Sequence, residues 1–268
     1  LDIYGEFNTL KNNFEKFAGQ VDDNGILIIK KGTELNVSQK QNQQKFYYSL
    51  TEKADFFAKN IRFENYKYVI DLVTPGTMIQ NLEIGFPGYI NVENAVAASA
   101  VAYLSGVSSN EIRSAVKSYQ GVKRRFDHKI LSDKIIYIDD YAHHPSELSA
   151  CIDSVKKMYA GKKITGIFQP HLYSRTRDFA NGFAKSLENL DQIILVDLYP
   201  AREEPIEGVS SKIIFDKIEN KNKKLCSRQE IVPLLNADNS DIILTLGAGD
   251  IDKEVEPIKE FLKRKYDI

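Results

Sequence analysis

The chain has 268 residues, of which 43% are hydrophobic and 27% charged, and this is enough apolar material for one large or two moderate cores. Thirty-six basic and 37 acidic residues leave a net charge of -1, which excludes a global field that would attract nucleic acid or anionic lipid. The longest apolar run, at 95–104, is too short for a membrane span. From the charge balance and this short run together, we expect neither nucleic-acid nor membrane partners.

The first part of the chain predicts a mixture of helices and strands. It opens "LDIYGEFNTL", without methionine or a signal-peptide pattern, which suggests a segment cut from a longer protein. We expect a helix at 6–18, a strand at 25–30, and strands with a turn at "TPGT" within 54–82. Two helical segments follow: the first ends at Gly106, and the second is capped by Ser109 or Asn110 and ends at Gly121.

Beyond residue 121 the pattern changes to a regular alternation of strands and helices. The order predicts a mostly parallel α/β sheet with helices on both faces, and therefore a domain at 1–121 followed by a second at 122–268. We assign "KNKK" at 221–224 to a solvated loop. The expected strands are 135–138, 164–168, 192–196 and 241–246, and the expected helices are 145–159, 176–189, 209–220 and 252–265.

Polar and glycine-rich sequences follow each of these four strands. They read "DDYAHHP", "QPHLYSRTRD", "DLYPAREEP" and "GAGD", in chain order. Ligands of open parallel sheets bind beyond the carboxyl ends of the strands. We therefore predict that the four sequences form one functional rim.

Each motif also has a purely structural interpretation. The paired histidines can cap the next helix, with Pro145 in its first turn. "SRTRD" can be a solvated helix start with Asp178 near the positive end of the dipole, although Arg175 and Arg177 with His171 also suit a carboxylate or phosphate clamp. "GAGD" lacks the third glycine of a dinucleotide fingerprint and favours a tight turn.

The remaining signals concern metals, compartment and the domain junction. No H-E-x-x-H motif or metal-spaced cysteine set occurs, so we expect no metal site in this chain. Cys151 and Cys226 fit a reducing, cytoplasmic environment. "VKRRF", at 122–126, is either a basic linker or part of a cleft at the junction.

Taken in order, "NVENAVAA", "GVKRRFD", "DDYAHHPSE", "FQPHLYSRTRDF", "YPAREEPIEG" and "GAGDI" resemble the Mur ligase family of peptidoglycan synthesis, and within it the branch that joins L-alanine to UDP-N-acetylmuramate. The resemblance covers the whole chain and is most specific over 121–208. In that family "LDIYG" follows a catalytic histidine. The resemblance thus implies the latter portion of a central ATP-binding domain at 1–121 and a complete, Rossmann-like, doubly wound C-terminal domain at 122–268.

The resemblance also implies roles for individual residues. Four residues would contact ATP. Asn91 and Asn94 would face the adenine, Arg125 would reach the nucleotide, and Asp140 would hold the ribose across the domain gap. The residues that would bind L-alanine and the acyl group are Tyr141, His143, His171 and Arg175. Of these, His143 and Arg175 would act in catalysis.

The implied reaction is an ATP-dependent amide ligation. ATP phosphorylates the lactyl carboxylate of UDP-N-acetylmuramate, the amine of L-alanine attacks the acyl phosphate, and the tetrahedral intermediate collapses to the amide. Both steps place negative charge on oxygen, which fixed cations and donors stabilise. Closure of two domains would orient the reactants and exclude water.

The chain departs from the family pattern in several places. Ile90 replaces a histidine common near the adenine, and Leu172 stands where many relatives carry arginine. No G-x-x-G-K-T phosphate loop occurs, and the family's Mg²⁺-binding glutamate and histidine, expected in the missing N-terminal part, are absent. We therefore expect the isolated chain to be inactive. The alternatives are a tripeptide ligase of cell-wall recycling, disfavoured by Tyr141, and a non-catalytic nucleotide-binding module.

Overall fold

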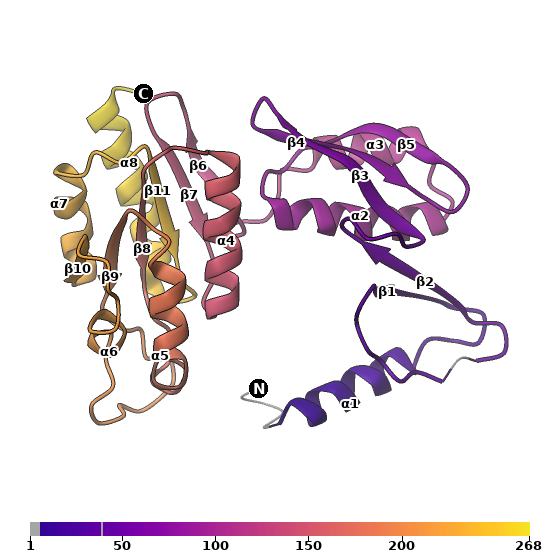
Figure 1. Cartoon of the computed structure of the whole chain (residues 1–268), viewed down its shortest axis with the longest axis horizontal. Helices are drawn as coiled ribbons and strands as arrows, with labels where there is room; N and C mark the ends of the chain where they lie inside the picture. Colours follow the sequence, from indigo (N-terminus) through magenta and orange to yellow (C-terminus); the bar gives the residue numbers. More distant parts are fainter. Residues whose placement is uncertain (1–5, 39) are drawn as a thin grey trace. The chain divides into compact units, whose positions relative to one another are not determined.

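A computed structural model describes residues 6–38 and 40–268, so the "LDIYG" motif lies outside the described residues. The chain divides into two compact units, 1–120 and 121–268 (Figure 1). The sequence analysis placed the boundary between residues 121 and 122.

The first unit is a mixed sheet with a long helix packed on it. Its strands lie in the order β1-β2-β3-β4-β5, parallel as far as β3 and antiparallel from β3 to β5. β2 was not predicted because its residues, "QKFYYS", begin with two polar residues and carry only a short apolar run. The elements are α1 (Phe7–Ala18), β1 (Ile26–Lys30), β2 (Gln44–Ser49), β3 (Phe56–Glu64), β4 (Lys67–Val73), β5 (Met78–Ile84), α2 (Tyr89–Leu104) and α3 (Ser109–Ser118).

Helix α2 packs on the sheet through small and branched side chains. Val92, Val96 and Ala100 are completely buried along one face, at helical spacing. The cap of α3 is Ser108, whose hydroxyl accepts a hydrogen bond from Glu111 N while the Glu111 carboxylate accepts one from Ser108 N. The prediction of Ser109 or Asn110 as the cap was therefore wrong by one or two residues, because the reciprocal bond requires a glutamate three positions on.

The second unit is the predicted parallel sheet, with strand order β10-β9-β8-β11-β7-β6. β6 is antiparallel to β7, and the other neighbours are parallel. This order confirms the doubly wound α/β fold. Its elements are β6 (Asp127–Leu131), β7 (Ile136–Asp140), α4 (Pro145–Met158), β8 (Ile164–Phe168), α5 (Tyr173–Leu187), β9 (Gln192–Val196), α6 (Lys212–Phe215), β10 (Lys223–Cys226), α7 (Ile231–Asn236), β11 (Ile242–Leu246) and α8 (Val255–Tyr266).

Helices cover both faces of this sheet. Figure 1 shows α4 and α5 on one face and α7 and α8 on the other. The strands are buried on both faces, which explains why they read as continuous apolar runs. The core between the sheet and helices α7 and α8 includes residues from both sides: Ile135, Tyr137, Ile167, Ile194, Val196 and Ile243 from the sheet side, and Ile231, Leu235, Ile258 and Leu262 from the helices.

Several predicted boundaries in this unit were wrong. The "KNKK" stretch is not a loop throughout, because Lys223 begins β10, which pairs with β9 at the sheet edge. Lys223 Nζ donates to the carbonyl oxygens of Phe215 and Ile218, which ties the strand to the end of a helix much shorter than predicted, Lys212–Phe215. Lysines suit an edge strand, since their charge discourages pairing with another chain. β6 and α7 were not predicted.

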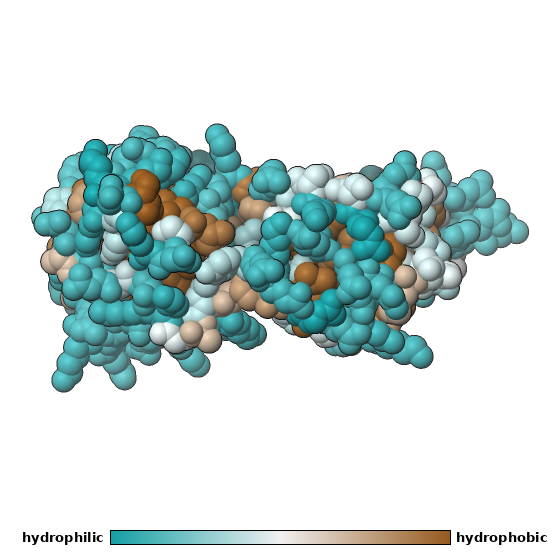
Figure 2. Space-filling view, turned by 90° about the horizontal axis from the view of Figure 1, so that it is seen from above, coloured by the Kyte–Doolittle hydropathy of each residue, from teal (hydrophilic) through white to brown (hydrophobic). Residues whose placement is uncertain are grey.

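The face seen in Figure 2 is mostly hydrophilic, with apolar side chains in separate groups. Among the described residues, no helix combines the length and hydropathy that a bilayer crossing requires.

A partly buried histidine lies between β6 and α4. His128 Nε2 is 2.8 Å from the Tyr159 hydroxyl, and the ring packs against Phe126. Burial lowers the pKa of His128 to about 4, even though the nearby Asp127 carboxylate favours the protonated form. The folded state thus binds this proton more weakly than the unfolded state does.

This difference predicts a loss of stability in acid. The contribution of neutral His128 is fully present above pH 6.5 and is lost as the pH falls towards 4, by on the order of 2–3 kcal/mol. Urea unfolding followed by circular dichroism should show a smaller decline over this range for His128→Gln than for the parent chain. His144→Gln, at the partly exposed start of α4, is the control. Equal pH dependence in the parent and His128→Gln would contradict the assignment.

Candidate functional site

The carboxyl ends of β7, β8, β9 and β11 form the predicted rim of the second unit. The sequence predicted that this strand ends at Ile138, but β7 continues through Asp139 and Asp140. Alternation along the strand sends these two carboxylates to opposite faces of the sheet. Two adjacent acidic residues therefore have different surroundings and different tasks.

Asp139 is completely buried and holds the rim together. Its Oδ1 accepts a 2.6 Å hydrogen bond from the Thr245 hydroxyl of β11, and its Oδ2 lies 3.6 Å from Arg124 Nε. Burial raises the pKa of Asp139, while Thr245 and Arg124 favour the ionised form. Arg124 also donates to the carbonyl oxygen of Gly247 at 2.5 Å, which joins the end of β11 to the segment before β6.

Asp140 fixes the two loops that flank its strand. Its Oδ2 accepts from Phe126 N at 2.7 Å and its Oδ1 from Ala142 N at 2.8 Å. Burial raises the pKa of Asp140, although these two hydrogen bonds oppose the shift. Phe126 has a φ of 54° and Arg124 a φ of 61°, conformations that non-glycine residues adopt only where their surroundings hold them.

Tyr141 continues the rim beyond β7. Its backbone N–H donates to Arg124 O at 2.7 Å, and the guanidinium groups of Arg124 and Arg125 lie 4.9 and 5.2 Å from its ring centroid. Both distances are within the range of cation–π attraction. The "VKRRF" segment is therefore part of the rim and not merely a linker.

The two histidines of "HHP" have different surroundings: one fits the structural interpretation, a helix cap, and the other fits the functional interpretation, a residue of the rim. His144 caps α4, with its Nδ1 2.8 Å from the Ser146 hydroxyl, as the structural interpretation proposed. His143 instead lies between the rings of Tyr141 and His171, at centroid distances of 5.3 and 6.4 Å. Its Nδ1 is 3.0 Å from Tyr141 O and 3.3 Å from a Glu147 carboxylate oxygen.

His171 joins this row of rings to the start of α5. It stacks on Tyr199 at 5.8 Å, and its Nδ1 is 3.3 Å from Arg175 Nη1, one helical turn on. Burial, Arg175 and His143 together lower the pKa of His171, so the ring is neutral at pH 7. A neutral ring can accept a hydrogen bond from Arg175 and so orient its guanidinium.

Arg177 does not join this arrangement. It forms an ion pair with Asp178 at 2.8 Å, and both side chains are about half exposed. Leu172, which departs from the family pattern, is largely buried at a φ of 72°, and its N–H donates to Tyr199 O at 3.0 Å. The cation of α5 that lies at the rim is thus Arg175.

Glu203 was not predicted and completes the start of α5. Its carboxylate accepts hydrogen bonds from Ser174 N at 2.9 Å and from the Ser174 hydroxyl at 2.5 Å. Burial alone would raise the pKa of Glu203, but these bonds, with Tyr173 N–H and Arg175, lower it. "YPAREEP" drew attention to this segment, but spacing alone could not select Glu203 from its acidic neighbour.

The "GAGD" sequence forms the predicted tight turn after β11. Gly247 has a φ of 141°, and a Cβ at Gly249 would lie 2.5 Å from Gln169 Oε1 and 2.7 Å from Tyr199 Cβ. Gln169 Oε1 accepts from Ile251 N at 2.8 Å, so the turn is fastened to the end of β8. Close packing against the rim explains both glycines.

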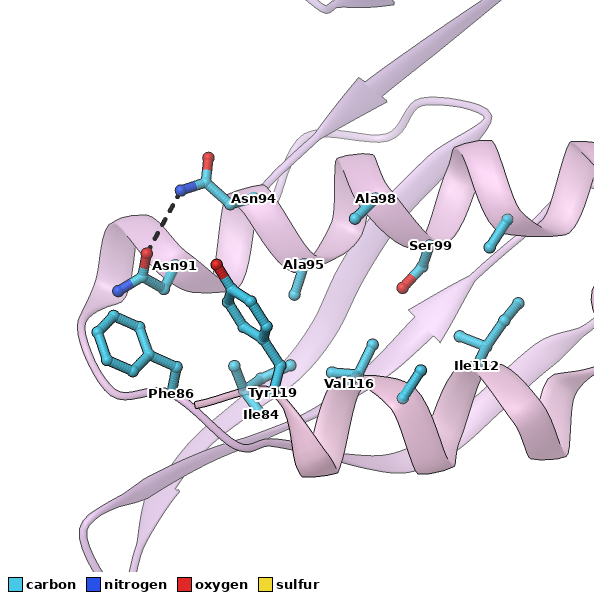
Figure 3. Close-up of a pocket in the computed structure, with 12 residues that line it drawn as sticks. Ile84, Phe86, Asn91, Asn94, Ala95, Ala98, Ser99, Ile112, Val116 and Tyr119 are labelled. Atoms are coloured by element: carbon cyan, nitrogen blue, oxygen red, sulfur yellow. Dashed lines mark hydrogen bonds between the residues drawn. The ribbon is translucent and has the colours of Figure 1, made fainter. Parts of the chain in front are cut away.

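Asn91 and Asn94 lie in the first unit, in the first turns of α2. Asn94 Nδ2 donates to Asn91 Oδ1 at 3.4 Å, and Asn91 Nδ2 donates to Pro87 O at 2.6 Å. Both side chains border a cavity next to Phe86 and Tyr119 (Figure 3). Ile90, the departure from the family pattern, is half exposed.

The predicted site residues thus fall into two groups. Tyr141, His143, His171 and Arg175 form a continuous row on the second unit, with Arg125 and Asp140 at one end. The asparagine pair is on the first unit. Within the described chain, no group of three or more histidine, cysteine or acidic side chains could hold a metal ion.

Two family models match separate parts of the chain. The family model for the Mur ligase middle domain matches residues 1–102, and that for "Mur ligase, glutamate ligase domain" matches residues 124–249. UDP-N-acetylmuramate--L-alanine ligase of Parabacteroides distasonis is 48% identical to this chain over 262 residues, and that of Phocaeicola vulgatus is 46% identical over 266. These alignments include 98% and 99% of this chain, but 57% and 58% of the two relatives.

Solved structures share the fold. UDP-N-acetylmuramate-alanine ligase MurC of Thermotoga maritima superposes with a TM-score of 0.76 at 22% identity, over 97% of this chain and 56% of that chain. Two family models that together match most of the chain, and relatives nearly half identical to it, agree with the observed architecture. The chain belongs to the Mur ligase family.

Proposed function

We propose that this chain is the portion of an ATP-dependent ligase that joins L-alanine to UDP-N-acetylmuramate. The rim of the second unit supports the proposal most directly, because it orders a row of donors and cations from Tyr141 to Arg175 at the place where parallel sheets bind ligands. The curated relatives carry this activity in their names. The chain spans 57% of the first of them, so the activity belongs to a longer protein.

The rim suits the recognition of an amino acid. A guanidinium binds a carboxylate through two parallel hydrogen bonds, and Arg175, oriented by neutral His171, can bind the L-alanine carboxylate in this way. The Tyr141 hydroxyl lies next in the row and can donate to an oxygen atom of the acyl group, and so can Nε2 of His143 when its imidazole is protonated. Donors fixed before the reaction stabilise the negative charge that develops on the tetrahedral intermediate.

Each of the two groups includes residues whose chemistry suits part of a nucleotide. The asparagine pair of α2 offers amide donors and acceptors to an adenine edge, beside the aromatic rings of Phe86 and Tyr119. Arg125 is suited to a phosphate oxygen, and Asp140 to a ribose hydroxyl. Magnesium usually accompanies such phosphates, held by one or two carboxylates. The described residues include no group of three or more histidine, cysteine or acidic side chains that could hold a metal ion.

Tyr141 favours the L-alanine ligase over the other ligase candidate. The runner-up attaches a tripeptide to the same sugar nucleotide. The Tyr141 ring, packed against His143 and both arginines, fills space at the rim next to the proposed alanine site. A small acceptor is therefore favoured over a tripeptide.

A chimera tests the proposed activity. The chain would be joined to the preceding portion of the Parabacteroides distasonis ligase, and amide formation would be measured with ATP, UDP-N-acetylmuramate and either L-alanine or a tripeptide. We expect ligation of L-alanine by the chimera and none by the isolated chain. Preferential use of the tripeptide would identify the runner-up, and a folded chimera inactive with both acceptors would support a non-catalytic module.

The asparagine pair can be tested in the isolated chain. We expect ADP to shift backbone amide signals at the start of α2 in a nuclear magnetic resonance titration. Asn94→Ala should weaken this binding about tenfold, because it removes an amide that a buried base edge requires. Asn110→Ala, on the exposed start of α3, should leave it unchanged. Equal ADP affinity in all three chains would show that the pair does not bind the base.

A further inference from the structure

Strand β1 is the outermost strand of the first sheet, and among the described residues it pairs with β2 alone (Figure 1). At the start of the strand, Gln44 N donates to Gly25 O at 3.1 Å. At its end, Lys31 N donates to Tyr48 O at 2.8 Å. Successive N–H groups of a strand point in opposite directions. The N–H groups that face the open edge, away from β2, are therefore those of Ile26, Ile28 and Lys30.

The sequence of β1 is that of a buried strand. It reads "ILIIK", with four apolar residues in succession, which is typical of parallel strands covered on both faces. Strand β11 of the second unit carries a similar run, "IILTL", and is buried at every residue. In β1, by contrast, Ile29 is buried but Ile26 is 39% exposed. The edge strand β10 begins with two lysines, which discourage further pairing, whereas the first four residues of β1 carry no charge.

An apolar hollow lies next to β1 on the side of helix α2. Ile26 and Ile28 line it together with Val101 and Leu104 of α2. Val101 is 54% exposed, although helix α2 is buried along the face that packs on the sheet. The helix and the strand thus leave apolar surface uncovered at the same edge.

A second apolar hollow lies next to β1 on the side of helix α1. Leu27 and Ile29 line it together with Phe14 and Phe17 of α1, which are 55% and 70% exposed. Successive side chains of a strand point to opposite faces of the sheet, so the two hollows flank β1 on both faces. An open backbone edge between two apolar hollows is the surface that one more strand, with its own side chains, would cover.

We propose that a strand that precedes α1 in the longer protein pairs with β1, parallel to it, and that its side chains fill both hollows. β1, β2 and β3 are already parallel to one another. Parallel neighbours are joined by a crossover, usually a helix packed on the sheet, and α1 directly precedes β1 in the chain. Helix α1 and strand β1 are thus two of the three elements of a strand–helix–strand unit.

The curated relatives have the length that such a strand requires. The alignment with the Parabacteroides distasonis ligase includes 98% of this chain but 57% of the relative. The inference rests on the proposed function only in taking the chain as a portion of a longer protein.

Hydrogen–deuterium exchange resolved to single residues tests the pairing, because β1 contains both kinds of amide. In the 268-residue chain we expect rapid exchange at Ile26, Ile28 and Lys30 and slow exchange at Leu27 and Ile29. In the chimera with the preceding portion of the Parabacteroides distasonis ligase, the three edge-facing amides should exchange more slowly by about a hundredfold. Slow exchange at the other two, in both proteins, reports that the sheet is folded.

A charged substitution at the edge tests the same surface. Ile26→Lys should restore rapid exchange at Ile28 and Lys30 in the chimera, because pairing would bury the charge without a partner. Met78→Lys is the matched control, since Met78 is 42% exposed but lies on β5, the opposite edge strand. It should leave the slow exchange at β1 unchanged.

Two results would overturn the proposal. Rapid exchange of the edge-facing amides in a folded chimera would show that no strand pairs with β1. Slow exchange of these amides in the isolated chain, increasing with protein concentration, would show that a second copy covers the edge. Ligation is measured separately: an active chimera with rapid exchange would contradict this inference alone, and an inactive chimera with slow exchange would contradict only the proposed function.

Discussion

The buried pairing of Asp139 with Thr245 and Arg124 is the constraint on which the rim depends. A carboxylate that is completely buried must have partners, and here they come from β11 and from the segment before β6. Arg124 is fixed as a result, and through it the Gly247 carbonyl and the ring of Tyr141 are also fixed. Side chains of three separate segments are thus held rigid before any ligand arrives, which electrostatic stabilisation of a reaction requires.

The row of rings extends this rigidity to the start of α5. Tyr141, His143, His171 and Tyr199 contact one another in sequence, and Arg175 is held at its end by neutral His171. His144, the residue after His143, is not part of the row and instead caps α4. Where a strand end is followed directly by a helix start, one residue can lie at the rim and the next can cap the helix. For this reason the same motif supported a structural and a functional interpretation.

The fold was largely predictable because the strands of the second unit are buried on both faces and read as apolar runs. β10 was missed because an edge strand is half exposed and its lysines resemble a loop, and α7 was missed because six residues do not establish a helical period. The candidate site was predicted at the level of motifs. Arg124, Tyr199 and Glu203 were not selected, because their importance lies in contacts with residues distant in sequence: Gly247, His171 and Ser174.

The most direct test of a functional rim is the KM for L-alanine in a chimeric ligase that carries Arg175→Lys. Lysine keeps the charge but loses the paired donors, so we expect the KM for L-alanine to rise at least tenfold while the KM for ATP stays within about twofold. Arg177→Lys, on the same helix but paired with Asp178 in solvent, is the matched control and should change neither value. An unchanged KM for L-alanine in Arg175→Lys would contradict the assignment of the rim to the amino-acid substrate.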